Sequence, residues 1–191
     1  MTIRLAISGF GRIGRMVLRA SQEMQSDDME VVLINSPGPV ETSAHLYEFD
    51  SVHGRAAGEV TFGDDWMNIG NGKIHMSRER DPGNIPHAAQ RVDIVLECSG
   101  KFNSRDASAA HLRAGAKKVL VSAPCKNADT TIVFGVNHNN LTEDDNVVSN
   151  ASCTTNCLAP IAKVLAETVG IESGYMTTIH AYTGDQPTLD S

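Results

Sequence analysis

The 191-residue sequence lacks a long apolar run, a dense set of cysteines and any run of lysine or arginine. A membrane-spanning helix needs about 20 consecutive apolar residues, and the apolar stretch near the N-terminus is too short for a signal peptide. The four cysteines, at positions 98, 125, 153 and 157, include no CxxC pair of the kind that binds zinc. We therefore expect a cytoplasmic protein in a reducing compartment, with no bound metal and no membrane partner.

The balance of charge also excludes one class of partner. The formal net charge is −7, and 41% of the residues are hydrophobic while 20% are charged. These proportions are ordinary for a globular protein with a buried core. A negative chain without a basic cluster repels phosphate backbones, so we expect no nucleic acid as a principal partner.

A glycine motif near the N-terminus predicts a dinucleotide site. The apolar segment 3–8 runs directly into Gly9, Gly11 and Gly14 in the spacing GxGxxG, and a helical pattern follows. In this context the first glycine permits a tight turn, the second lets a pyrophosphate approach the backbone, and the third lets the helix pack on the strand. A second apolar segment, 30–35, completes a strand–helix–strand unit. A structural glycine turn is the less favoured alternative.

Strands and helices alternate beyond this unit. We expect further strands over 91–100, 118–123, 130–136 and 146–150, and a helix over 104–116 that begins at a serine cap. This alternation predicts an α/β fold with a doubly wound, Rossmann-type parallel sheet. Segment 50–86 is rich in Gly, Asp and Asn and contains hairpin signals, so it is expected to form a β insertion.

Small residues follow two of the expected strands. Ser99 and Gly100 come after the first, and Ser122 comes after the second. Open α/β sheets bind ligands at the carboxyl ends of their strands. These residues are therefore candidates for cofactor contact, although ordinary strand-to-loop turns would have the same composition.

The acidic residue that usually grips the adenosine ribose is missing. It should follow the second strand, about 20 residues beyond the glycines, but the chain has Asn35, Ser36, Pro37, Gly38 and Pro39 there. No carboxylate is present to repel a 2′-phosphate, and no arginine is present in the turn to bind one. We expect NADP to be accepted alongside NAD or in preference to it.

The second half of the chain contains a candidate nucleophile. Cys153 lies in the run NASCTTN, where a polar turn precedes an amphipathic helix that ends near Gly170. Unpaired N–H groups and the helix dipole favour a thiolate at a helix N-terminus. His180 follows in an apolar segment expected to be a strand, and it could pair with the thiolate and move protons. Taken alone, one cysteine and one histidine would be better explained by a buried, inert thiol, because most buried thiols simply pack, but the surrounding motifs favour the catalytic pair. Cys157, one turn further on, is expected to pack as a small hydrophobe.

Four motifs resemble those of phosphorylating glyceraldehyde-3-phosphate dehydrogenases. They are SGFGRIGR near residue 8, HLYEFDSVHGR near 45, NASCTTNCLAP near 150 and TTIHAYTGDQ near 177. The resemblance implies that Cys153 is the nucleophile and His180 its acid/base partner. It implies contacts to the dinucleotide from Arg12, Ile13, Asn35, Arg80, Ser99 and Ser122. It also implies phosphate sites lined by Ser152, Thr154, Thr183 and Asp185. Ser36 falls where NAD-dependent relatives carry aspartate.

The same resemblance implies an overall organisation and reaction. Residues 1–150 would form the dinucleotide-binding domain, and residues 151–191 would begin an α+β catalytic domain. The substrates would be glyceraldehyde 3-phosphate, NAD or NADP and inorganic phosphate, and the product 1,3-bisphosphoglycerate would form through a thioester on Cys153. A homotetramer is implied.

Three alternatives stay open. An erythrose-4-phosphate dehydrogenase shares the fold and the thiol, a dinucleotide-binding module would lack turnover, and a Cys–His hydrolase would have no use for the glycine motif. Family members continue beyond the catalytic histidine, so we expect the segment alone to expose apolar faces and to be poorly soluble or inactive.

Overall fold

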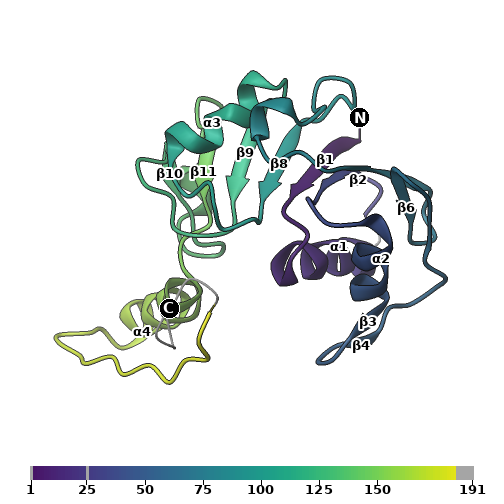
Figure 1. Ribbon diagram of the computed structural model, residues 1–191. Helices are drawn as coiled ribbons and strands as arrows, with labels where there is room; N and C mark the ends of the chain where they lie inside the picture. The colour runs from purple at the N-terminus through teal and green to yellow at the C-terminus, as the bar shows by residue number, and fades with distance from the viewer. Residues whose placement is uncertain (1, 25, 184–191) are drawn as a thin grey trace, which may run out of the picture.

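The computed structural model describes residues 2–24 and 26–183. These residues form a nine-stranded sheet in the order β10-β11-β9-β8-β1-β2-β7-β6-β5 (Figure 1). Its strands are β1 Ile3–Ser8, β2 Met29–Asn35, β5 Thr61–Phe62, β6 Trp66–Asn68, β7 Lys73–Ser77, β8 Ile94–Glu97, β9 Lys118–Val121, β10 Thr130–Thr131 and β11 Val147–Ser149. The helices are α1 Arg12–Met24, α2 Val40–Glu48, α3 Arg105–Arg113 and α4 Cys153–Thr168, with 3-10 turns at Pro82–Asn84 and His138–Asn140. A separate hairpin joins β3 Phe49–Asp50 to β4 Gly54–Arg55.

The centre of the sheet is parallel. β1 pairs in parallel with β2 on one side and β8 on the other, and β8, β9, β11 and β10 continue in the same direction. All of these strands therefore end at one edge of the sheet, which we call the carboxyl edge. The expected α/β fold with a Rossmann-type sheet is confirmed.

Helices cover both faces of the sheet because successive strand residues point to opposite sides. Ile7 and Ile34 belong to the core that contains Leu18 of α1 and Tyr47 of α2. Their neighbours in the strands, such as Leu33, belong to a second core. α3 packs against β9 and β11. Figure 1 shows α1 and α2 on one side of the strands and α3 on the other.

Local chemistry explains where α3 begins and ends. The Ser104 hydroxyl accepts a hydrogen bond from the Ala107 backbone N–H at 3.4 Å, as the sequence predicted for a serine cap. Asp106 lies in the first turn and Arg113 in the last, where their charges complement the helix dipole.

The expected β insertion is partly corrected by the structure. Its strands do not form a separate unit, because β7 pairs in parallel with β2 and extends the main sheet, and β6 and β5 follow it in an antiparallel meander. The expected strand over 130–136 is reduced to Thr130–Thr131. Asn137 is the reason: its side chain accepts from the Val133 N–H and donates to the Thr131 carbonyl, so these groups are not free for a neighbouring strand.

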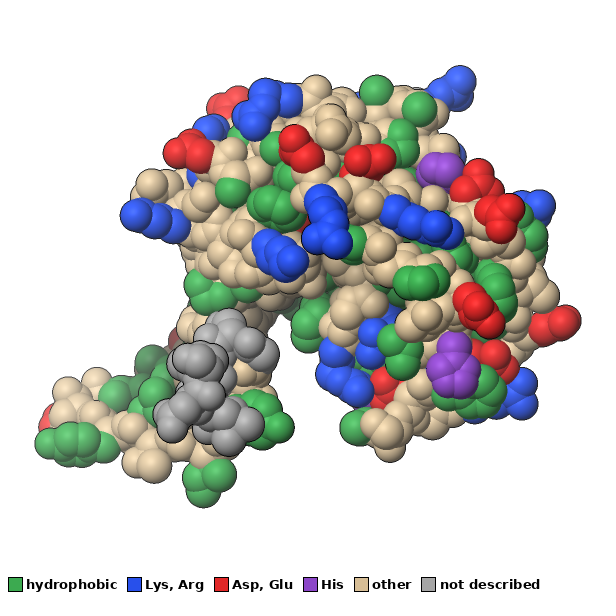
Figure 2. All heavy atoms as spheres, in the orientation of Figure 1, with side chains coloured by type: hydrophobic (Ala, Val, Ile, Leu, Met, Phe, Trp, Pro, Cys, Tyr) green, Lys and Arg blue, Asp and Glu red, His purple; other side chains and the backbone are tan. Residues whose placement is uncertain are grey.

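The expectation of a strand around His180 was wrong. Residues 171–183 contain no helix or strand, and Tyr175 and Ile179 are fully exposed. A strand requires a neighbour for its backbone groups, and the described part of the chain offers none here. The apolar positions of α4 are also exposed, including Ile161 and Val164. Figure 2 shows hydrophobic side chains gathered on this part of the surface.

The three motif glycines occupy different environments. Gly9 has φ +90°, and an added Cβ would lie 2.5 Å from the Ser99 backbone. A Cβ on Gly14 would lie 2.2 Å from the Gly9 carbonyl oxygen and 3.0 Å from Ile7 Cγ2. Gly11 has no atom within 4 Å of its Cβ position. Folding therefore requires glycine at positions 9 and 14 but not at position 11.

We expect Gly14→Ala to lower the free energy of unfolding by about 1–3 kcal/mol, because the added methyl must displace backbone atoms. Gly11→Ala, the matched control, should change it by no more than about 0.5 kcal/mol. Urea denaturation of both variants measures this. Equal losses in the two variants would contradict the packing described for Gly14.

Candidate active site at the carboxyl edge

A cysteine and a histidine meet at the start of α4. Cys153 is the first residue of this helix, and the Ser152 hydroxyl caps it by accepting from the Thr155 backbone N–H at 3.0 Å. The distance from Cys153 Sγ to His180 Nε2 is 3.0 Å. His180 Nδ1 donates to the Ala181 carbonyl, which leaves Nε2 directed to the sulfur.

The contact changes the acidity of both groups. The hydrogen bond with His180 lowers the pKa of the Cys153 thiol, and the Thr154 backbone N–H lowers it further. The Ala181 carbonyl and the sulfur raise the pKa of His180. Both directions favour the thiolate–imidazolium form, which is the nucleophilic state of a cysteine.

Buried polar contacts attach α4 to the sheet. The Ser149 hydroxyl, at the end of β11, donates to the Ala123 carbonyl at 3.0 Å and accepts from the backbone N–H groups of Cys125 and Ala151. Ala151 has φ +57°, which turns the chain from the strand into the helix. Asn156 then donates to the Asn150 and Ser152 carbonyls. Cys153 therefore lies just beyond the carboxyl edge.

The residues expected at phosphate sites lie partly in this region. Ser152 and Thr154 flank Cys153 in the first turn of α4, where backbone N–H groups are directed outward. Thr183 lies three residues beyond His180 and is exposed. Asp185 lies outside the described residues.

The glycine turn packs against the end of β8. Gly9 is in van der Waals contact with Ser99, and the Cys98 backbone N–H donates to the Ser8 carbonyl at 2.7 Å. Gly100 follows with φ +72°, a conformation that favours glycine. These expected cofactor residues are therefore neighbours in space although they come from distant parts of the chain.

Asn35 orders the loop that carries Arg80. Its side-chain oxygen accepts from the Ser77 hydroxyl and the Glu79 N–H, and its side-chain nitrogen donates to the Glu79 carbonyl at 2.9 Å. These bonds use both acceptor positions of the side-chain oxygen and one of the two N–H groups of the side-chain nitrogen. Arg80 is exposed at the same edge, and Ser36 follows β2 without a carboxylate beside it in the turn.

An ion pair fixes the start of α1. Arg12 Nη1 lies 3.0 Å from Asp50 Oδ2 in the β3–β4 hairpin. The backbone N–H groups of His53 and Val52 donate to Asp50, and together with Arg12 they hold the pKa of its carboxyl well below the usual range. Ile13 is 51% exposed beside this pair. The exposed Ile13 side chain and the paired Arg12 guanidinium therefore lie next to Gly11, whose Cβ position faces open space.

The remaining cysteines differ from Cys153. Burial raises the pKa of Cys98 to about 11, although Ser122 hydrogen-bonds to its sulfur. Cys157 was expected to be packed, but it is exposed on α4. The packing expectation for Cys157 was therefore wrong, because no other element covers this face of the helix in the described part of the chain.

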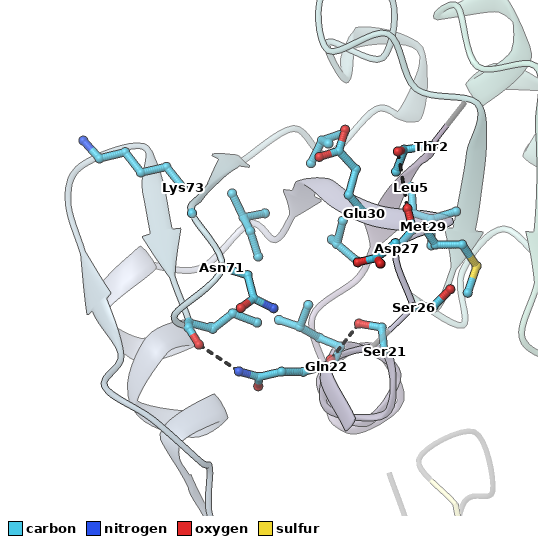
Figure 3. A pocket seen from close by; sticks show the side chains of 16 residues that line it. Thr2, Leu5, Ser21, Gln22, Ser26, Asp27, Met29, Glu30, Asn71 and Lys73 are labelled. Carbon is cyan, nitrogen blue, oxygen red and sulfur yellow. Dashed lines mark hydrogen bonds between the residues drawn. The ribbon is translucent and has the colours of Figure 1, made fainter. Parts of the chain in front are cut away.

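A further cavity lies elsewhere. It measures about 620 Å³ and is lined by α1, by the first residues of β1 and β2, and by the turn between β6 and β7 (Figure 3). Gln22 closes one side by donating to the Ile69 carbonyl at 2.8 Å. The cavity is therefore at the amino ends of the parallel strands, away from the edge where such sheets bind nucleotides.

Two residues of the site were not identified from the sequence. Asp50 lies within the HLYEFDSVHGR motif, but only the structure reveals its contact with Arg12. Glu97 is fully buried at the end of β8, and it accepts hydrogen bonds from Ser99. A lone carboxylate inside an apolar strand was the available signal for Glu97, because such a charge requires partners.

Two absences complete the description of residues 2–24 and 26–183. No set of three or more His, Cys, Asp or Glu side chains converges as metal ligands would. No helix among them has the length and apolar content to cross a membrane.

Comparison with known proteins matches both halves of the chain. Residues 3–105 match the family model described as the NAD binding domain of glyceraldehyde 3-phosphate dehydrogenase, and residues 152–191 match the model of its C-terminal domain. Glyceraldehyde-3-phosphate dehydrogenases of Xanthobacter flavus and Cereibacter sphaeroides are 63% and 62% identical over the whole chain. Glyceraldehyde-3-phosphate dehydrogenase 2 of Bacillus subtilis is 50% identical.

The chain spans 56–57% of the length of these relatives. The first family model alone covers more than half of the chain. The chain therefore belongs to the glyceraldehyde-3-phosphate dehydrogenase family.

Proposed function

We propose that the protein oxidises glyceraldehyde 3-phosphate with NAD or NADP and inorganic phosphate, and forms 1,3-bisphosphoglycerate. The observation that carries the proposal is the 3.0 Å contact between Cys153 Sγ and His180 Nε2 at the N-terminus of α4. The names of the matched relatives agree with this activity and do not favour the erythrose-4-phosphate alternative.

The proposed domain boundary follows the sheet. Residues 1–150 would form the dinucleotide-binding domain, because the last strand of the sheet ends at Ser149. Residues 151–191 would begin the catalytic domain. The positive φ of Ala151 marks the change of direction between the two.

A dinucleotide fits the carboxyl edge. The empty space at the Gly11 Cβ position admits a pyrophosphate close to the backbone, and the exposed face of Ile13 offers an apolar contact. Arg12 supplies a fixed positive charge. The proposed cofactor-binding residues are Gly9, Gly11, Arg12, Ile13, Gly14, Asn35, Ser36, Arg80, Ser99, Gly100 and Ser122.

The reaction would begin with the Cys153 thiolate. Its sulfur attacks the aldehyde carbon, and a proton moves to the new oxygen to give a hemithioacetal. His180 then removes the hydroxyl proton through Nε2, which favours loss of hydride and leaves a thioester on Cys153. When bound, the dinucleotide supplies the acceptor for this hydride.

Inorganic phosphate would complete the cycle. A phosphate oxygen attacks the thioester carbon, the C–S bond breaks, and Cys153 leaves as a thiolate beside protonated His180. A thioester retains enough of the free energy of oxidation to form an acyl phosphate, whereas an oxygen ester would not. We assign the phosphate groups of substrate and reactant to Ser152, Thr154, Thr183 and Asp185.

The proposed setting follows from composition and family membership. We infer a cytoplasmic homotetramer, and four free thiols agree with a reducing compartment. Neither nucleic acid nor a membrane is proposed as a partner.

In a protein of full family length, Cys153→Ser should abolish phosphate-dependent NADH formation, because serine forms an oxygen ester and is not activated as a thiolate. His180→Asn should lower kcat about 10²–10⁴-fold, the usual contribution of a positioned acid/base. Cys157→Ser, the matched control, should keep near-normal activity. Assays of NADH formation with and without phosphate measure this. Equal loss in both serine variants would refute the roles, and cofactor binding without turnover would support a binding module.

The alkylation rate of Cys153 should rise with pH at a midpoint below that of an ordinary thiol, because His180 lowers its pKa. In a Cys157→Ser background, iodoacetamide modification followed by mass spectrometry gives this profile. His180→Asn should move the midpoint to higher pH, because the lost hydrogen bond no longer favours the thiolate. An unchanged midpoint would show that His180 does not activate the thiol.

The wild-type protein should use NAD and NADP with kcat/KM values within about tenfold of each other, because no carboxylate at position 36 repels a 2′-phosphate. Ser36→Asp should lower kcat/KM for NADP at least about tenfold while it preserves use of NAD, since like charges in contact are strongly unfavourable. Steady-state kinetics with both cofactors measures this. A strong preference of the wild type for NAD would contradict the assignment.

A further inference from the structure

Three buried side chains connect the end of β8, through α3, to the loop that follows the 3-10 turn Pro82–Asn84. Glu97, His111 and His87 are each no more than 1% exposed. His111 Nε2 lies 3.0 Å from Glu97 Oε2, and His87 Nε2 lies 2.9 Å from His111 Nδ1. The other carboxylate oxygen of Glu97 accepts from the backbone N–H and the hydroxyl of Ser99. The chain of hydrogen bonds therefore ends at a residue of the cofactor edge.

The positions of the protons in this series of hydrogen bonds follow from the state of His87, the histidine at its far end. His87 Nδ1 is buried and has no hydrogen-bond partner in the described residues. Burial lowers the pKa of His87 to about 4, so its ring is neutral. If Nδ1 carries only a lone pair, Nε2 of His87 donates to His111, and Nε2 of His111 donates to Glu97. This direction leaves no buried N–H group unpaired and presents Glu97 to Ser99 as an acceptor.

The contact with the Glu97 carboxylate gives the hydroxyl of Ser99 one polarity. Its single proton is donated to Glu97, and the Lys101 backbone N–H donates to its oxygen at 3.1 Å. A serine oxygen has two acceptor positions, so one lone pair remains for a ligand. Ser99 is half-buried beside Gly9, where the glycine turn meets β8.

We propose that Glu97 is a positioning residue that holds the Ser99 hydroxyl as a hydrogen-bond acceptor for an N–H or O–H group of the dinucleotide. The inference rests on the proposed function, since it takes the carboxyl edge as the cofactor site. The donor is a ribose hydroxyl or the carboxamide N–H of the nicotinamide. Phosphate oxygens are excluded as partners of this hydroxyl, because they only accept hydrogen bonds.

Binding of NAD to the full chain, measured by calorimetry, tests the proposal with four variants. Ser99→Ala should raise Kd about 3- to 10-fold, the effect of one lost hydrogen bond. Glu97→Leu should raise it by a similar factor, because the freed hydroxyl no longer keeps its orientation. The Kd of the double variant should not exceed the higher of the two Kd values of the single variants, since both changes act on one hydrogen bond. Ser99→Thr should restore binding.

The control for damage to the core is His87→Phe. It alters the same buried chain at its far end and leaves the Ser99–Glu97 contact in place, so Kd should stay within about twofold even if the melting temperature falls. A purely structural role of Glu97 would make this control and Glu97→Leu behave alike.

A cofactor analogue identifies the donor. In 3-acetylpyridine adenine dinucleotide a methyl ketone replaces the carboxamide, so no amide N–H is available. If the Ser99→Ala penalty disappears with this analogue, the carboxamide is the donor, and if it persists, a ribose hydroxyl is. Either result supports the proposal when Glu97→Leu weakens binding.

Three outcomes would overturn the inference. They are an unchanged Kd in Ser99→Ala, additive effects in the double variant, or tighter binding in Glu97→Leu, which would mean that Ser99 acts as a donor. If Glu97→Leu does not fold, the comparison of Ser99→Ala with Ser99→Thr still decides whether the hydroxyl contributes. Failure of the wild type to bind NAD or NADP would instead reject the proposed function itself.

Discussion

Parallel pairing of β1 with β2 and β8 is the constraint on which the rest of the structure depends. Because these strands run in one direction, the turns that follow them lie side by side. The glycine turn after β1 contacts Ser99 after β8, and its first N–H donates to the Asn35 carbonyl at the end of β2. The proposed cofactor site is therefore built from the segments that follow the ends of these strands, and backbone hydrogen bonds within the sheet position the strand ends.

The same constraint extends to the thiol. β11 joins the sheet beside β9, and Ser149 connects its end to the turn that begins α4. Lys163 adds a second attachment by donating to the Gly135 carbonyl at 2.9 Å. The N-terminus of α4 is thus held by polar contacts, while most of its apolar side chains remain exposed. These polar contacts therefore fix the position of Cys153 relative to the carboxyl edge, without packing on the apolar side chains of α4.

The sequence predicted those features that local chemistry determines. Glycine spacing predicted the tight turn at Gly9 and the close packing at Gly14, the serines at 104 and 152 predicted helix starts, and Cys153 was correctly placed at a helix N-terminus. Features that depend on distant partners were missed. The segment around His180 has the composition of a strand but no neighbouring strand within residues 2–24 and 26–183, and Asn137 shortened the strand expected after Thr130. The bonds of Asn35 and Glu97 could not be predicted, because their partners are set by tertiary contacts.

The contact between Gly9 and Ser99 also has a consequence for the order of folding during synthesis. Proteins emerge from the ribosome N-terminus first, so the glycine turn is made long before the strand against which it packs. β1 can pair with β2 early, but its other edge stays open until β8 has left the exit tunnel. The earliest-translated part of the nucleotide site therefore reaches its final shape only when residues near 99 are available.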